Sequence, residues 1–378
     1  MPSPEVLDFA KLAAPIAGEN PAGRPLREEI AHDAVYYVLK DVRSTARALE
    51  RQMAFGGDES PSDQRPDWRP ILDKAPMVLA EQSKDLEVTG WLIEALVRQH
   101  GFAGLRDGFR LARELVEGFW ENLYPLPDEE GVETRVSPLS ALNGVDSDGV
   151  LIDPIFNVSI TEATTGRAFG VAGYRQAVEV EQISDPNKRA ARIAHGAADM
   201  KDVREAISAT SRDFFRNLLD DVAACAEEWE KLGRVLDEKC GRGPDGFPAA
   251  PPSSNIRNAL QSCQDTIKQI ARDVLGTDAP TGASGAVEGQ PAASSGAGAA
   301  LQAPGGPIRT REDAFRMLLE VAEFFKRTEP HSLVSYRLEE TVRLGRMSLP
   351  ELLSELIPQE NARTEAMKLV GVRPKTES

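Results

Sequence analysis

Carboxylate side chains are the groups of this chain best suited to chemistry, because they can hold a divalent cation or form an acid–base pair. Asp146, Asp148 and Asp153 have a spacing similar to that of a calcium-binding loop. An EF-hand loop requires a bidentate acid at its twelfth position, and counting from Asp146 that residue is Asn157. We therefore predict a hydrated acidic turn here, without a bound metal ion.

A second acidic segment follows Pro125 and Pro127. A catalytic pair of carboxylates needs a pocket that shifts the pKa of one of them, whereas turn residues flank this segment. We predict an exposed loop that contacts another protein, formed by Asp128, Glu129, Glu130 and Glu133. The alternative from another functional class is a metal-dependent hydrolase that uses the acidic segments around Asp128 and Asp146. Metal-dependent turnover that is abolished by Asp146→Ala would support this alternative.

A glycine motif and the scattered histidines and cysteines complete the candidates for chemistry. Residues 241–246 match GxGxxG, but a dinucleotide site needs this motif between a strand and a helix. Here the motif follows a predicted helix and contains a proline, so we predict an inter-helix turn. The histidines are His32, His100, His195 and His331, and the cysteines are Cys225, Cys240 and Cys263. They show no HExxH or CxxC spacing, and we expect no catalytic residue, cofactor or metal.

The overall charge argues against a strongly anionic partner. The chain has 378 residues, a formal net charge of −16 and a pI of about 4.9. It therefore has no global field that would attract nucleic acid or an anionic membrane. No apolar run approaches the roughly 18 residues of a membrane helix, and the N-terminal segment lacks the pattern of a secretory signal. We predict a cytoplasmic protein without direct membrane insertion.

The residue pattern from Lys84 to Gly144 predicts a helical hairpin. Apolar residues recur at spacings of three and four on both sides of a break at residues 100–104. The glycines of this break predict a tight turn, and Pro125 ends the second helix. Upstream, we predict helices at 25–55 and 68–80. Residues 145–180 have a less regular pattern, in which 155–160 could form a strand or a covering loop.

In the remaining chain, the residue pattern predicts further helices on both sides of a flexible linker. Helical spacing over 187–239 and 256–274 predicts an antiparallel pair. Residues 276–307 are Ala, Gly, Ser and Pro almost throughout, which predicts a flexible linker with a reach of roughly 30 Å. Three short helices follow, and a core of that size favours self-association. The residues that we expect to face a neighbouring subunit are Phe324, Phe325, Leu333, Tyr336, Leu352 and Leu356.

The predicted fold class is therefore all-α, with several helical bundles and a small helical oligomerisation unit. We expect an N-terminal helical domain over residues 1–180 and a middle helical domain over 187–275. The flexible linker would span 276–307, and the C-terminal oligomerisation domain would span 308–378.

Several short motifs resemble the ImpA/TssA family of the bacterial type VI secretion system. In the N-terminal part they are Asn20-Pro21-Ala22-Gly23, Leu26-Arg27, Lys84-Asp85-Leu86, Trp91-Leu92, residues 100–105, Leu123-Tyr124-Pro125 and Leu142-Asn143-Gly144. Those that resemble the C-terminal region of short-form members are Glu329-Pro330-His331-Ser332, Tyr336, Gly345-Arg346-Met347 and residues 349–353.

The resemblance implies a structural function. Members of the family associate with the cytosolic baseplate and help to prime or coordinate polymerisation of the tail tube and contractile sheath. It also implies a ring-like homo-oligomer, formed through the C-terminal region, with baseplate subunits, sheath subunits and the tube protein as partners. A monomeric cytosolic adaptor or chaperone is the other alternative, and light scattering on the full-length protein distinguishes it from a ring.

Overall fold

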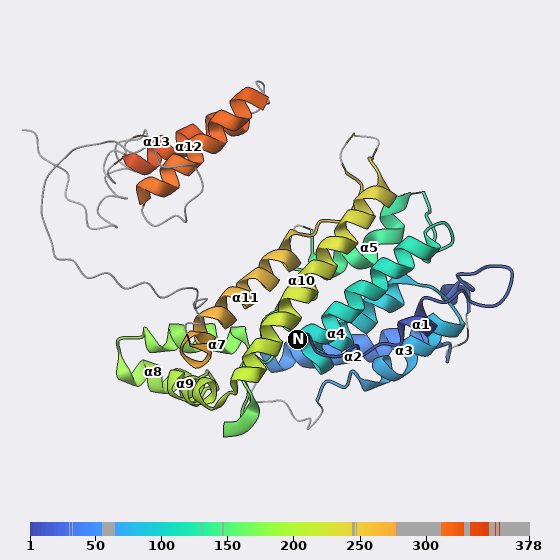
Figure 1. Cartoon of the computed structure of the whole chain (residues 1–378), viewed down its shortest axis with the longest axis horizontal. Helices are drawn as coiled ribbons and strands as arrows, with labels where there is room; N and C mark the ends of the chain where they lie inside the picture. Colours follow the sequence, from blue (N-terminus) through green and yellow to red (C-terminus); the bar gives the residue numbers. More distant parts are fainter. Residues whose placement is uncertain are drawn as a thin grey trace, which may run out of the picture. The chain divides into compact units, whose positions relative to one another are not determined.

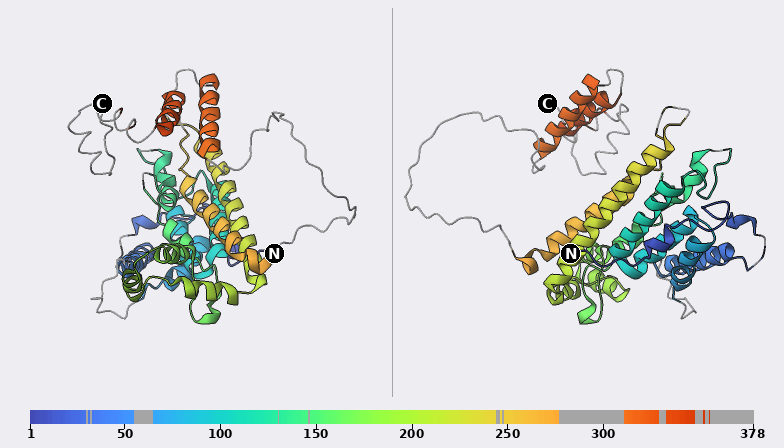
Figure 2. Two further views of the ribbon diagram at one scale, coloured as in Figure 1. Left: turned by 90° about the vertical axis from the view of Figure 1, so that its left-hand side faces the viewer. Right: turned by 45° about the vertical axis from the view of Figure 1, so that its right-hand side comes forward.

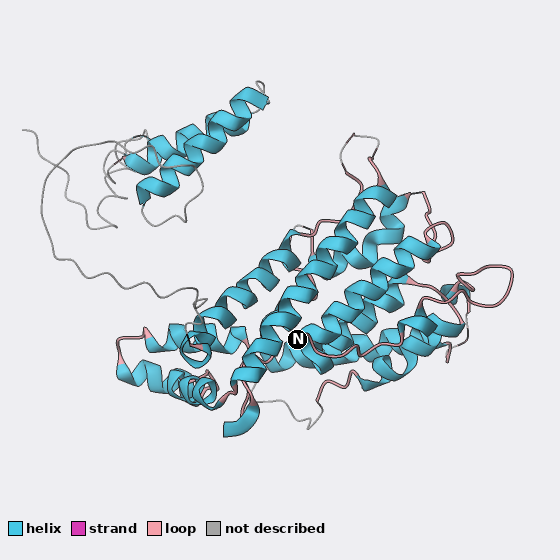
Figure 3. Cartoon of the chain, in the orientation of Figure 1, coloured by secondary structure: helices cyan, strands magenta, loops and turns pink. Residues whose placement is uncertain are grey.

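The computed structural model describes residues 1–276 apart from 30, 32, 55–64, 130, 146, 244, 245 and 247, together with residues 311–328, 333–347, 352 and 355. The chain divides into two compact units, Met1–Ala283 and Ser284–Ser378. Helices dominate both units, and the described residues form isolated bridges but no strand (Figure 3). The predicted all-α fold class is therefore confirmed, while the predicted linker lies outside the described residues except for Gly276.

The helices of the first unit are α1 (Phe9–Leu12), η1 (Leu26–Glu28), α2 (Val35–Ala54), α3 (Arg69–Glu81), α4 (Leu86–Phe119), α5 (Val132–Asn143), α6 (Ile152–Asn157), η2 (Ala163–Thr165), α7 (Val171–Glu181), α8 (Pro186–Ala194), α9 (Met200–Ala209), α10 (Arg212–Cys240) and α11 (Ser254–Leu275) (Figure 1). Those of the second unit are α12 (Arg311–Thr328) and α13 (Leu333–Arg346). Both η1 and η2 are 3-10 helices. The helix predicted over 25–55 begins ten residues later, at Val35, because Pro25 and the η1 turn precede it.

Helix α4 is the hairpin that the sequence predicts. Its two arms, residues 86–100 and 102–119, are separated by Gly101, whose φ of 57° and ψ of −139° interrupt the helix. Such a positive φ is readily adopted only by glycine. At the open end, Leu86 N donates to Tyr124 O (2.8 Å) and Tyr124 N donates to Lys84 O (3.0 Å), so the two arms return to the same place.

Glycine also allows the two arms to approach each other closely. A Cβ atom on Gly104 would lie 2.5 Å from the Leu96 carbonyl oxygen, and one on Gly108 would lie 2.7 Å from Ile93 Cγ1. Both distances are shorter than any ordinary carbon contact, and Leu96 and Ile93 belong to the opposite arm. The hairpin therefore depends on small residues at these two positions of its second arm.

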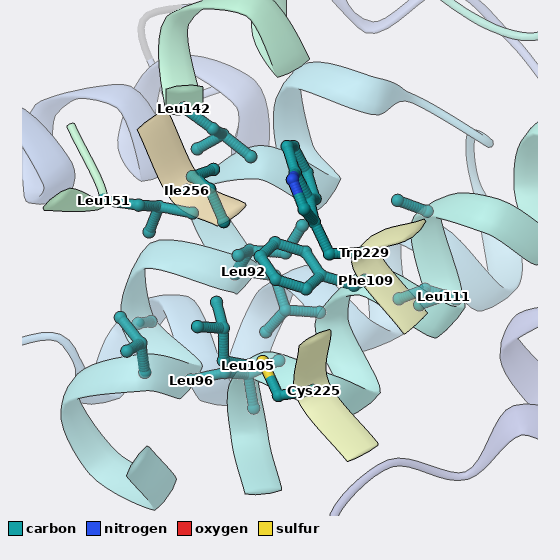
Figure 4. Packing of buried hydrophobic residues seen from close by; sticks show 14 of the residues in the cluster. Leu92, Leu96, Leu105, Phe109, Leu111, Leu142, Leu151, Cys225, Trp229 and Ile256 are labelled. Carbon is teal, nitrogen blue, oxygen red and sulfur yellow. The ribbon is translucent and has the colours of Figure 1, made fainter. Parts of the chain in front are cut away.

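Helices from distant parts of the sequence surround this hairpin. Helix α3 packs on α4, and α10 lies along α4 with α11 beside it (Figures 1 and 2). In the core, the rings of Phe109 and Trp229 lie 4.7 Å apart between centroids, and Figure 4 shows them facing each other. The ranges 1–180 and 187–275, which the sequence pattern separates, thus contribute to one continuous hydrophobic core.

A smaller cluster lies under helices α7 and α9. Phe169, Ala177, Met200 and Val203 are buried there. Helix α8 contacts α7 but buries none of its own residues. The segment for which the sequence suggested a strand or a covering loop forms α6 instead, followed by a single bridge between Ser159 and Gly170. Ile155 faces the core in this helix, which accounts for its apolar character.

The second unit is built on a pair of packed helices, α12 and α13. The guanidinium groups of Arg311 and Arg346 lie over the Phe315 ring, 5.1 and 5.6 Å from its centre. Lys326 on α12 forms an ion pair with Glu339 on α13 at 2.5 Å. These contacts connect the two helices mainly through charged side chains and a single aromatic ring.

We predict that Gly104→Ala lowers the free energy of unfolding by about 1–3 kcal/mol, because the added methyl group would force the arms of α4 apart. Gly118→Ala is the matched control, since nothing lies within 4 Å of a Cβ at that position of the same helix. It should be neutral or stabilising by up to about 1 kcal/mol. Urea unfolding followed by circular dichroism measures both changes, and equal effects would show that close arm packing is not the cause.

Candidate interaction surfaces

The N-terminal motif residues meet at the base of the α4 hairpin, where Lys84 joins four segments. Its backbone N–H donates to Ala22 O (2.8 Å), and its ammonium group donates to Leu12 O and Leu79 O, both at 2.7 Å. The side chain is fully buried, and burial lowers the pKa of Lys84 to about 8. This lysine is used inside the fold and is not available to a ligand.

The neighbouring charges are also used internally. Asp85 is buried, pairs with Arg27 at 3.0 Å and accepts from Glu87 N at 2.7 Å, so it caps the start of α4. Burial raises the pKa of this carboxyl group against the opposing effect of Arg27. Glu87 binds Arg27 and accepts from the Tyr36 hydroxyl at 2.8 Å. These contacts hold η1 and α2 against α4, so the role of the cluster is structural.

Asn143 connects the N-terminal motif region to α11. Its side-chain Oδ1 accepts a hydrogen bond from Ile256 N (3.0 Å), and its backbone oxygen accepts one from Asn255 Nδ2 (3.1 Å). The first N–H groups of a helix have no partner within the helix. Asn143 provides the missing partner for α11, although it lies 113 residues before Ile256. Its position in the sequence does not reveal this role.

The acidic loop consists of residues 128–131 before α5 together with Glu133 in the first turn of α5, and each of its described acidic residues is exposed. Asp128, Glu129 and Glu133 are exposed, whereas Glu130 lies outside the described residues. Asp128 accepts a hydrogen bond from the Thr134 hydroxyl. The carboxylates of Glu129 and Glu133 form no hydrogen bond or ion pair with any described residue, and the nearby Leu126 is 49% exposed. The predicted surface position of the loop is thus seen, and its role in binding stays a prediction.

The predicted oligomerisation residues are found on the helical pair of the second unit. Leu333 and Tyr336 are 74% and 59% exposed and line a shallow depression along α13. Phe325 and Leu352 are half-buried. The side chain of Phe324 and the whole of Leu356 lie outside the described residues. Leu333 and Tyr336 are therefore the described members of the set that are free to meet another molecule.

The remaining candidates from the sequence are placed as connecting or packing residues. The glycine motif lies between α10 and α11, where Arg242 donates to Gly246 O (2.7 Å). Cys225 and Cys263 are buried, and burial raises the pKa of Cys263 to about 12. Asp146, His32 and His331 lie outside the described residues.

The described residues offer neither a metal site nor a membrane-spanning helix. No three His, Cys, Asp or Glu side chains in the described ranges come close enough together to hold a metal ion. In the same ranges, no helix combines the length and the apolar character that crossing a membrane requires.

Comparisons with known proteins agree on one family. The model of the family described as ImpA, N-terminal, type VI secretion system matches residues 13–144. The type VI secretion system component TssA1 of Pseudomonas aeruginosa is 28% identical over 368 residues, which are 96% of this chain and 98% of that protein. A solved structure, the N-terminal domain including the conserved ImpA_N region of TssA from Burkholderia cenocepacia, matches with a TM-score of 0.57 and 25% identity. The match covers 71% of this chain and 94% of that one.

An all-helical chain whose motif residues brace its own core, and whose exposed features are an acidic loop and an apolar helix face, belongs to the class of structural proteins that act through protein contacts. The family match and the two relatives narrow this class. The chain carries an ImpA-type N-terminal region at residues 13–144 and is similar over nearly its whole length to a TssA component of the type VI secretion system, as its motifs indicated.

We predict that Asn143→Ala lowers the free energy of unfolding by about 1–3 kcal/mol, because it leaves the buried Ile256 N–H without a partner. Asn187→Ala, at an exposed position on α8, is the control and should change stability by less than about 0.5 kcal/mol. Hydrogen exchange adds a local test, since amides in the first turn of α11 should lose protection in the Asn143 variant. Unchanged protection there would contradict the capping role.

The buried ammonium group of Lys84 predicts a pH dependence. Its pKa of about 8 in the folded protein lies below the ordinary value of 10.5, so the unfolded chain binds more protons between these values. Stability from this group should rise with pH above about 8, by up to about 1.4 kcal/mol per pH unit.

Comparison with Lys84→Met isolates this effect from the tyrosines and cysteines, which also titrate at alkaline pH. The variant should be less stable at every pH, because Leu12 O and Leu79 O lose their donor. The difference in unfolding free energy between the two proteins should grow from pH 8 to pH 9.5. A constant difference would mean that the lysine titrates normally.

Proposed function

We propose that this chain is a structural component of the type VI secretion system that associates with the baseplate and primes or coordinates polymerisation of the tail tube and sheath. It acts in the cytoplasm as a ring-like homo-oligomer, assembled through the C-terminal region, and binds baseplate subunits, sheath subunits and the tail tube protein. The proposal is supported by a TssA1 relative that aligns with 96% of this chain, including its C-terminal part.

The main support for an oligomer is that the second unit has more exposed than buried apolar side chains among its described residues. Among its described residues, only Ala322 and Val342 are buried apolar residues. Six larger apolar residues are at least 36% exposed: Met317, Leu319, Val321, Leu333, Val334 and Tyr336. A helical pair with so small a core gains little from folding alone. Contact with further copies would bury the exposed side chains and add the missing stabilisation.

Multivalency connects this oligomer to the proposed role. A ring of C-terminal units would carry many N-terminal units on linkers, which for short flexible linkers raises the local concentration to the millimolar range. Contacts that are weak one at a time then suffice to gather tube and sheath subunits at one place. The acidic loop with Glu129 and Glu133 is our candidate for a contact with these subunits.

Replacing Leu333 and Tyr336 together by Asp tests the oligomer. Each apolar side chain buried in an interface contributes about 1.5–3 kcal/mol, and a carboxylate in its place would have to be desolvated. We expect the full-length double variant to dissociate into monomers or dimers in multi-angle light scattering. In the native host, secretion of the tube protein should fall to background.

Met77→Asp is the matched control, because Met77 is also an exposed apolar residue (59%) but lies on α3 of the first unit. It should keep both the assembly mass and secretion. Retention of the full mass by the Leu333/Tyr336 variant would contradict assembly through α13. A monomeric wild-type protein would favour the adaptor alternative.

A further inference from the structure

Helix α2 carries a group of arginines that the fold satisfies only in part. This arginine cluster consists of Arg43, Arg47 and Arg51 on α2 and Arg98 on α4. Arg98 forms a bidentate pair with Glu50 at 2.6 and 2.8 Å, and Arg43 pairs with Glu94 at 2.6 Å. The other two arginines, Arg47 and Arg51, have much weaker contacts.

Arg47 and Arg51 have unused hydrogen-bonding capacity. Arg47 Nε lies 3.8 Å from Glu94 Oε2, which is too far for a hydrogen bond, and Glu94 Oε2 is a buried atom without a hydrogen-bond partner. Arg51 is exposed, and no ion pair of the described residues involves it. Desolvation lowers the pKa of Arg47, and the nearby charges of Arg43, Arg51 and Arg98 lower it further.

The cluster is therefore a local basic surface on an acidic protein. Among the described residues, its four arginines pair with two carboxylates, those of Glu50 and Glu94, so the arginines outnumber the carboxylates by two. The whole chain has a net charge of −16. Guanidinium groups with free N–H donors bind carboxylates well, since the two planar groups match in shape.

The complementary groups are on the same chain, in the acidic loop before α5. Glu129 and Glu133 are exposed and have no partner among the described residues. Leu126, three residues before Glu129, is an apolar side chain that is 49% exposed. The loop thus offers carboxylates, and the cluster offers unpaired donors.

The loop and the cluster lie at opposite ends of the α4 hairpin. Helix α2 runs in the same direction as the first arm of α4, because Tyr36 contacts Glu87 while Glu50 contacts Arg98. The C-terminal end of α2 therefore lies beside the hairpin turn. The loop lies at the hairpin base, where Arg135 on α5 donates to the carbonyl oxygens of Glu121 and Pro125, both at 3.4 Å.

This separation decides which contacts are possible. An arm of fifteen helical residues is about 20 Å long, so the loop cannot reach the cluster of its own chain. Because the two surfaces differ and lie at opposite ends, their contact between two copies would be head-to-tail, with a free loop and a free cluster left at the ends.

We propose that the acidic loop of one copy docks on the arginine cluster of the next copy, with Glu129 and Glu133 approaching Arg47 and Arg51. Exposed ion pairs are worth only about 0–1 kcal/mol each, so the contact would be weak between free chains. It rests on the proposed oligomer, whose C-terminal ring would supply the high local concentration. The contact would align neighbouring N-terminal units within the ring.

Disulfide cross-linking of the full-length protein tests this contact without altering any of its charges. Ser44 lies on the same face of α2 as Arg47 and Arg51, and Ser137 lies one turn after Glu133 on α5; both serines are exposed. Under mild oxidation, the double variant Ser44→Cys/Ser137→Cys should give a ladder of dimers, trimers and larger species on non-reducing gels. All variants carry Cys240→Ser, because Cys240 is only half-buried, whereas Cys225 and Cys263 are buried. Each single variant should then stay at the background of the chain without introduced cysteines.

Charge reversal provides the second measurement. In the cross-linking background, Arg51→Glu should reduce the ladder at least fivefold, and adding Glu129→Arg should restore it to within twofold. Neither residue has a described partner, so neither change should disturb folding, and circular dichroism checks this. The ladder should also weaken when salt is raised from about 0.05 to about 0.5 M, because ions screen exposed charges.

The other outcomes separate this contact from the proposed oligomer. An assembled protein, by light scattering, that gives no ladder contradicts the contact and leaves the oligomer in place. A monomeric protein contradicts the proposed oligomer. In that case, the contact between loop and cluster is tested by cross-linking at about 1 mM protein, the effective concentration expected in such an assembly. A missing ladder at this concentration contradicts the contact as well. An Arg51→Glu variant that keeps the ladder but abolishes secretion would assign the cluster to an acidic partner protein instead of a second copy.

Discussion

The closure of the α4 hairpin at its base is the constraint on which the first unit depends. Lys84 follows α3 in the chain, and its backbone forms hydrogen bonds with Ala22 and Tyr124. Its ammonium group donates to Leu12 O and Leu79 O. A buried ammonium group is costly to desolvate unless its donors are used. Two carbonyl acceptors, together with the Phe119 ring 5.4 Å away, make this position tolerable. They also make it specific, since a different packing of the N-terminal segment would remove the Leu12 O acceptor and leave the ammonium group with Leu79 O alone.

From this base, the polar residues of the family motifs act inward. Asp85 begins α4 and holds Arg27, and Asn143 caps α11. A carboxylate or an amide that is buried and fully engaged cannot also recognise a partner, so these motifs specify the fold. Binding must then use residues that the scaffold leaves exposed, which in the described part of the chain include the acidic loop, Arg51 on α2 and the apolar face of α13.

Local patterns predicted the elements better than their arrangement. The break at Gly101 and the spacing of the apolar residues were enough to predict the α4 hairpin, because turn chemistry and helical period are encoded locally. The packing of α10 on α4 could not be predicted in the same way. An apolar stripe such as that around Trp229 shows that this face of the helix is buried, but it does not show which helix covers it. The sequence also hid the cap that Asn143 provides, as Ile256 is 113 residues away. The arginine cluster did leave a signal: Arg43, Arg47 and Arg51 recur every four residues on one helix.

Charge limits how copies of such a chain can assemble. With a net charge of −16 on each copy, neighbouring chains repel one another wherever they approach within the screening length of about 8 Å. The apolar face around Leu333 and Tyr336 can supply affinity against this repulsion, but an apolar contact between second units would not by itself orient the first units. Orientation requires a directional contact between unlike charges. The donors of Arg47 and Arg51 are suited to that role, because Arg47 lies 3.8 Å from its nearest carboxylate and Arg51 forms no ion pair with any described residue.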